Sequence, residues 1–221
     1  MRRFLTALIV LAIPIVFYSC SIGDAKSLFE DGLAEMKAGN IVKAKEIFDS
    51  IKEKDPQSPY VNHAQAIYLD MEGFIYEAIN ANYLTQIDNL DFLPSLFHSA
   101  NLLSKLNLPG VAFFDISLYR DKGGDPRLSL AMEIQLYLEA GKLDEAEKHL
   151  DKYRQEMAGD PLFIISEANY LLRAGEFESS LDKCHEAIEA GKDDVDIIKR
   201  SGDFYRQFGL MDSAAYYYDN A

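Results

Sequence analysis

The stretch of residues 32–56, GLAEMKAGNIVKAKEIFDSIKEKDP, decides the fold, because its pattern returns every 34 residues. A glycine series starting at Gly39 continues, at that spacing, through Gly73, Asn107, Gly141, Gly175 and Gly209. An alanine series starting at Ala44 continues through Ala78, Ala112, Ala146, Ser180 and Ala214. Two series that share one period without an insertion indicate an array of short repeated units.

Each repeat is predicted to hold two short amphipathic helices. Apolar residues seven apart, such as Leu96 and Leu103, form one helical stripe in the first helix. The small residues between them, which let neighbouring helix backbones approach closely, are Gly32, Ala66, Ala100, Ala168 and Gly202. The glycine series ends the first helix, because the residue after a helix often adopts a left-handed conformation that Gly reaches freely and Asn tolerates. Boundaries between repeats are marked by Asp55-Pro56, Asp125-Pro126 and Asp160-Pro161.

This period, with a small residue eighth, Gly fifteenth, Ala twentieth and a large apolar residue twenty-fourth, resembles the tetratricopeptide repeat (TPR) family. Another helical-hairpin repeat is the alternative. The resemblance implies an all-α, right-handed superhelical solenoid of about six helix-turn-helix repeats. The expected segments are a signal peptide (1–19), a lipidated cysteine with a short tether (20–24), repeats at 25–58, 59–92, 93–126, 127–160 and 161–194, and an incomplete sixth repeat at 195–221. The second and third repeats diverge most from the pattern.

The N-terminal residues have the pattern of a targeting segment. Arg2 and Arg3 precede an apolar run over residues 5–18, which is shorter than the roughly 20 residues that a membrane span needs. The run ends before Ser19-Cys20 and resembles a bacterial lipobox, in which the cysteine is lipidated and becomes the first mature residue. An uncleaved anchor or an ordinary signal peptide is the alternative interpretation.

The lipobox resemblance implies a location. A mature bacterial lipoprotein carries three acyl chains, palmitate among them, and several chains give stable membrane attachment. Ser21 stands where an inner-membrane retention signal would often have Asp, which favours the outer membrane, facing the periplasm. With Cys20 acylated, Cys184 is the only thiol left, and it falls on an apolar helix position where a buried, inert thiol is expected.

Composition excludes several function classes. The formal net charge of −14 repels nucleic acid and anionic membrane surfaces. The chain has no Gly-rich phosphate loop, no nucleophile elbow and no His-Glu-x-x-His zinc helix. His63 and His98 fall on successive first helices but lack an identified third ligand. We therefore expect no enzyme activity, no cofactor and no metal.

The TPR resemblance also implies a binding surface, because first helices line the concave face of such arrays. The N-terminal half of that face is apolar and contains methionine, which adapts to varied partners. The predicted groove residues, for an apolar helix or peptide, are Phe29, Leu33, Met36, Tyr60, His63, Ile67, Met71, Phe97 and Asn101. The alternative is that these side chains pack against neighbouring helices.

Two further features bear on partners. Asn101 and Asn169 occupy the asparagine position of the clamp with which some TPR proteins bind C-terminal carboxylates, but Phe97 and Ile165 replace its lysine, so this mode is rejected. Near the C-terminus, three tyrosines predict contact with a partner or a second copy, and thus a homodimer as one alternative: Tyr216, Tyr217 and Tyr218.

Together these features predict a lipid-anchored scaffold for protein–protein interaction at a bacterial envelope membrane, with partners close to the bilayer. An alternative within this class is a component of the outer-membrane protein assembly machinery. An alternative of another class is an accessory protein that binds a small ligand or glycan for an envelope enzyme or transporter.

Overall fold

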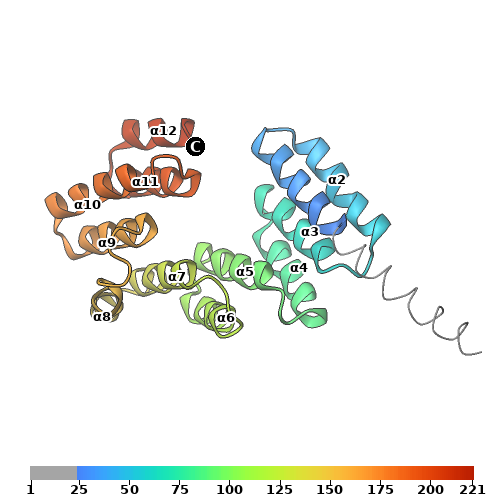
Figure 1. Cartoon of the computed structure of the whole chain (residues 1–221), viewed down its shortest axis with the longest axis horizontal. Coiled ribbons are helices and arrows are strands. Elements are labelled where there is room, and N and C mark those ends of the chain that lie inside the picture. Colours follow the sequence, from blue (N-terminus) through green and yellow to red (C-terminus); the bar gives the residue numbers. More distant parts are fainter. Residues whose placement is uncertain (1–23) are drawn as a thin grey trace, which may run out of the picture. The chain divides into compact units, whose positions relative to one another are not determined.

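The computed structural model describes residues 24–221, and within that range all regular secondary structure is helical (Figure 1). The helices are 24–37, α2 (Ile41–Lys54), α3 (Pro59–Met71), α4 (Ile75–Asp88), α5 (Leu93–Lys105), α6 (Pro109–Asp121), α7 (Pro126–Glu139), α8 (Leu143–Tyr153), α9 (Pro161–Ala174), α10 (Phe177–Ala190), α11 (Val195–Phe208) and α12 (Met211–Asp219). Among these residues, no helix is long and apolar enough to cross a membrane. The predicted signal peptide and Cys20 lie outside the described residues.

Each short turn between a first and a second helix contains the residue of the glycine series. All six of these residues have positive φ, from 57° at Asn107 to 89° at Gly209, as the sequence predicts. Two of the predicted boundaries begin helices: Asp125 and Asp160 cap the N-termini of α7 and α9 with their side chains, and a proline follows each. At Asp55-Pro56 the first residue instead ends α2, and Ser58 caps α3.

The described chain divides into two compact units. Unit 1 comprises residues 24–102 and unit 2 comprises residues 103–221, so the division falls inside α5. The sequence period by itself predicts one uninterrupted array. The division lies in the third repeat, which departs from the pattern just afterwards, at Asn107-Leu108-Pro109-Gly110.

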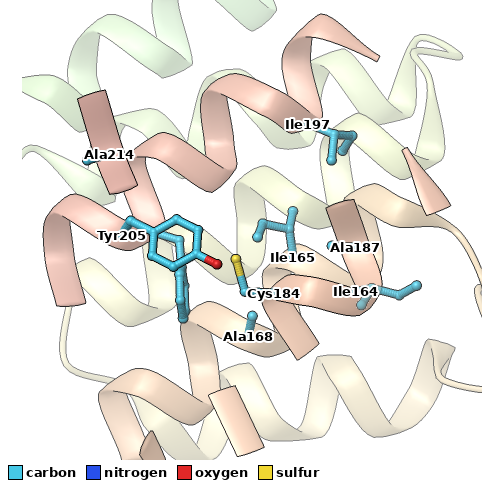
Figure 2. Packing of buried hydrophobic residues seen from close by; sticks show 9 residues of the cluster. Ile164, Ile165, Ala168, Cys184, Ala187, Ile197, Tyr205 and Ala214 are labelled. Carbon is cyan, nitrogen blue, oxygen red and sulfur yellow. The ribbon is translucent and has the colours of Figure 1, made fainter. Parts of the chain in front are cut away.

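The alanine series forms the centre of both units. All six of its members, including Ser180, are buried. Unit 1 also contains a buried cluster built on Phe29, Phe48 and Ile51. In unit 2, a cluster on α9, α10, α11 and α12 includes Cys184, whose sulfur faces the Tyr205 hydroxyl (Figure 2). Burial raises the pKa of the Cys184 thiol to about 12, so this thiol stays protonated and unreactive, as expected from its position.

At its two glycines, the eighth position of the repeat leaves no room for a larger side chain, whereas the fourth repeat has Ile134 there. A methyl group on Gly32 would lie 2.2 Å from Cε1 of Phe48, and one on Gly202 would lie 2.7 Å from Cε1 of Tyr218. Both aromatic rings come from the second helix of the same repeat. Glycine therefore occurs where the second helix supplies an aromatic ring, because the ring fills the space of the missing side chain.

Candidate functional site

The predicted groove residues all lie in unit 1, on helix 24–37, α3 and α5. The structure places two of them in the core. Phe29 is 8% exposed and His63 is 3% exposed, and their rings pack with centroids 5.2 Å apart. The prediction that these two side chains face a partner is not supported by this arrangement, because each is enclosed by neighbouring helices.

The remaining predicted residues keep part of their surface open. Leu33, Met36, Tyr60 and Ile67 are half-buried and pack on the edge of the Phe29 cluster, whereas Met71 is exposed at the end of α3. In α5, Phe97 and Asn101 are also half-buried, and the Asn101 amide donates to the Phe97 carbonyl oxygen over 3.2 Å. The open apolar surface of the first helices is therefore narrower than the sequence predicts.

A chain of buried polar side chains joins three helices of unit 1. Nδ1 of His63 donates to Oδ1 of Asn82 over 2.9 Å, and Nδ2 of Asn82 donates to Nδ1 of His98 over 3.0 Å. His98 thus has its proton on Nε2, which donates to Oδ2 of Asp70 over 3.3 Å. Burial lowers the pKa of His63 to about 4, so its imidazole is neutral at pH 7.

This chain of hydrogen bonds was not predicted, although the sequence contains a signal for it. Asn82 stands at the twenty-fourth repeat position, where four of the other five repeats have large apolar or aromatic side chains such as Phe48 and Ile116. A fully buried amide there requires polar partners from the adjoining first helices. His63 and His98 are those partners. The described residues contain no group of three or more His, Cys, Asp or Glu side chains able to hold a metal.

Unit 2 contains two buried carboxylates at the same repeat position. Glu133 pairs with Arg120, and Glu167 accepts from Nε of Arg154 over 2.9 Å. Lys183 also lies 3.4 Å from Glu167, at the edge of a surface cavity of about 420 Å³. The charged groups at this cavity pair with one another: Arg154 and Lys183 both contact Glu167. They therefore stabilise the packing of adjacent repeats and do not indicate a ligand.

The three C-terminal tyrosines have different surroundings. Tyr217 stacks on Tyr205 with ring centroids 5.1 Å apart and nearly parallel planes. The Tyr218 hydroxyl donates to Asp203 over 2.8 Å. Tyr216 is exposed on α12. The structure therefore gives Tyr217 and Tyr218 contacts within unit 2, and the role of the trio toward a partner or second copy stays a prediction.

The two asparagines at the clamp position bond to backbone carbonyl oxygens of their own helices. The Asn169 amide donates to the Ile165 carbonyl oxygen of its own helix over 2.9 Å, as Asn101 does with Phe97. Ile165, at the position of the clamp lysine, is a buried apolar side chain. The rejection of a carboxylate clamp, made from the sequence, stays a prediction.

Comparison with known proteins identifies the fold. No protein-family model matches the sequence, and no curated protein is similar enough to count as a relative. Among solved structures, TTC0263, a TPR protein of Thermus thermophilus, is similar with a TM-score of 0.67 and 15% identity, covering 81% of this chain and 98% of that one. PilW, a type IV pilus biogenesis factor, is similar with a TM-score of 0.64 and 12% identity, covering 87% and 90%.

A third similar structure is YrrB, a TPR protein with an unusual peptide-binding site. Its TM-score is 0.50 at 12% identity, and the match covers 78% of this chain and 89% of that one. These likenesses agree with the 34-residue period, the positive-φ turn residues and the buried alanine series. The chain therefore has the tetratricopeptide-repeat fold.

Proposed function

We propose that the protein is a scaffold for protein–protein interaction, held at a bacterial envelope membrane by a lipid on Cys20. One observation carries the proposal: Leu33 and Ile67 remain partly open on the first helices of the first two repeats, at a position where the other four repeats have polar residues. Leu33 and Ile67 stand at the repeat position that Gln135, Asn169 and Asp203 occupy in unit 2. Because core packing in unit 2 is satisfied with polar residues there, the apolar choice in unit 1 favours a binding role.

The proposed ligand is an apolar helix or extended peptide of a membrane-proximal protein. Leu33, Met36 and Ile67 supply apolar contacts, and Met71 supplies an adaptable one at the end of α3. PilW is a pilus biogenesis factor and YrrB has a peptide-binding site, so pilus proteins and peptides are the first ligands to test.

Co-purification from native membranes under mild detergent tests the scaffold. The variant Ile67→Gln with Met71→Lys copies the residues of the fourth and third repeats at these positions, Gln135 and Lys105. We expect it to fold and to lose the partner that the unaltered protein retains. The matched control is Val42→Gln, which removes an exposed apolar side chain from α2. Retention of the partner by the double variant would show that this face does not bind it.

The anchor is tested separately. Cys20→Ser removes the acylation site, and we expect the protein to move from the membrane fraction to the soluble fraction and to lose incorporated palmitate. An unchanged membrane fraction would show that another segment or a partner holds the protein at the membrane.

A further inference from the structure

One face of α4 carries large apolar side chains that are exposed to solvent. Tyr76 is 72% exposed, Leu84 is 45% exposed and Ile87 is 78% exposed. Their spacings of eight and three residues place them on one side of the helix, with Asn80 between them. Exposed Phe74 and Leu90 extend the surface at the two ends of α4. We name Tyr76, Leu84 and Ile87 the α4 stripe; it runs for about 17 Å along the helix.

The repeated architecture supplies an internal comparison. In α10, the positions equivalent to the α4 stripe are occupied by exposed residues, namely Glu178, Glu186 and Glu189. The corresponding residues at α8 are Asp144, Lys152 and Gln155, also exposed. Folding of a second helix in this chain therefore does not require apolar residues at these positions. The α4 stripe is a property of this helix and not of the repeat.

The charged residues on α4 and in the turns at its two ends are all acidic. No lysine or arginine lies between Lys54 and Lys105 in the sequence. Glu77 and Asp88 lie beside the stripe on α4, and Glu72 and Asp91 are exposed close to its ends. The surface is therefore an apolar strip bordered by negative charge.

We propose that the α4 stripe binds an amphipathic helix whose apolar side is bordered by lysine or arginine. Such a partner covers the apolar strip and places its cations opposite the acidic border. The face lies on a second helix, so it is distinct from the first-helix surface described above. An array that uses both would bring two different proteins together.

The acidic border of the α4 stripe distinguishes among three candidate occupants: a membrane surface, a second copy of the chain and a cationic helix. An anionic membrane surface would be repelled by the acidic border. A second copy packed face to face would bring two acidic borders together, because a two-fold interface places the same patch on both partners. A cationic amphipathic helix meets neither cost.

The test uses the full chain and a synthetic amphipathic helix of about five turns, with leucine on one side and lysine on the other. The matched probe has glutamate in place of every lysine. Binding is measured by fluorescence anisotropy at low and high salt. We expect the lysine probe to bind, its affinity to fall with salt, and the glutamate probe to bind at least about tenfold more weakly.

The decisive variant is Leu84→Ser with Ile87→Gln, which copies Ser50 of α2 and Gln155 at the end of α8 and leaves the net charge unchanged. We expect about a tenfold loss of lysine-probe affinity. Ile87→Gln alone alters a side chain outside the core, so it gives a folded variant in any case. The controls Val42→Gln on α2 and Ile67→Gln on the first-helix surface should keep the affinity.

Three results would overturn the proposal. The first is unchanged lysine-probe affinity in the Leu84→Ser, Ile87→Gln variant. The second is equal affinity for the lysine and glutamate probes. The third is binding to phosphatidylcholine or anionic vesicles that depends on the α4 stripe while the lysine probe fails to bind, which would assign the face to a membrane. If Ile67→Gln lowers the lysine-probe affinity and the Leu84→Ser, Ile87→Gln variant does not, the probe binds to the first helices and not to the α4 stripe. That result would overturn this proposal but would not contradict the proposed function.

Discussion

At the scale of single residues, Asn82 has a large effect because its amide serves two buried imidazoles at once. The amide oxygen accepts from His63 and the amide nitrogen donates to His98. A buried polar group that loses its partner keeps the full cost of having left water. The hydrogen-bonded chain therefore fixes the packing of α3, α4 and α5 within unit 1.

We predict that Asn82→Ala destabilises unit 1 by about 2–4 kcal/mol, since it leaves two buried nitrogen atoms without partners and opens a cavity. Asn80→Ala is the matched control on the same helix, where an exposed asparagine gives way to a better helix former. Urea unfolding of both variants measures the difference. Equal stability of the two variants would show that the hydrogen-bonded chain contributes nothing.

Unit 2 also contains a buried polar side chain, that of Asp115. It is 2% exposed, and its Oδ2 has no hydrogen-bond partner among the described residues. Burial raises its pKa from 3.8 to about 6, so the folded state favours the protonated acid. Its contribution to stability is fully present below pH 3.8 and is lost as the pH rises through 6.

Asp115→Asn keeps the shape of the side chain and removes its titration. We expect this variant to be more stable than the parent by about 1–3 kcal/mol at pH 8, with the difference disappearing near pH 4. Urea unfolding across this pH range provides the measurement. A constant difference at all pH values would mean that the change acts through packing alone.

At the scale of the helix pair, the distance between the two helices of a repeat depends on the combined size of the side chains that face each other, such as Gly32 and Phe48. We predict that Gly32→Ala costs about 1–3 kcal/mol, because the added methyl group would overlap the Phe48 ring. Phe48→Leu should recover part of this loss in the double variant, as leucine stands at that position in the fourth repeat. Gly110→Ala meets no atom within 4 Å and should be neutral or stabilising. Urea unfolding of the three variants measures these differences.

Local rules suffice to predict the helix pairs. The glycine series requires a left-handed turn residue, and even Asn107 adopts one with φ of 57°. The alanine series requires a small buried side chain, and each member is buried. The period alone does not decide features that depend on facing residues of several helices. Phe29 and His63 are buried, although the TPR resemblance implies that they line a binding face.

The candidate surfaces are less predictable for the same reason. A periodic pattern assigns a residue to one side of a helix but not to an exposed or enclosed place on that side. In the sequence, Asn82 is only a departure from the repeat pattern. In the structure, its amide forms hydrogen bonds with His63 of α3 and His98 of α5. The α4 stripe required knowledge of which second-helix positions face solvent.

At the scale of the whole molecule, we predict that the regions around His63 in unit 1 and Asp115 in unit 2 respond to acid in opposite directions. The pKa of His63 in unit 1 is lowered from 6.5 to about 4, so protons bind the unfolded state first and unit 1 loses stability as the pH falls through that range. Asp115 gives unit 2 the reverse dependence between pH 6 and 3.8.

Hydrogen exchange at pH 7 and pH 5, corrected for intrinsic rates, measures this contrast. Peptides from residues 59–88 should lose protection at pH 5, whereas peptides from residues 109–139 should gain it. His63→Phe, which copies Phe29 and Phe97, should reduce the pH dependence of the first set and leave the second unchanged. A change of the same sign in both units would contradict the assignment of these two groups.

The absence of lysine between Lys54 and Lys105 has a practical consequence for anyone who labels or immobilises this protein. Amine-reactive dyes, biotin esters and sensor-chip couplings leave α3, α4 and nearly all of α5 chemically untouched. Because residues 55–104 also contain no arginine, trypsin does not cleave within this region, and amine-directed crosslinkers do not react there. Carboxylate-directed reagents are the appropriate choice there, because Glu72, Glu77, Asp88 and Asp91 are all accessible.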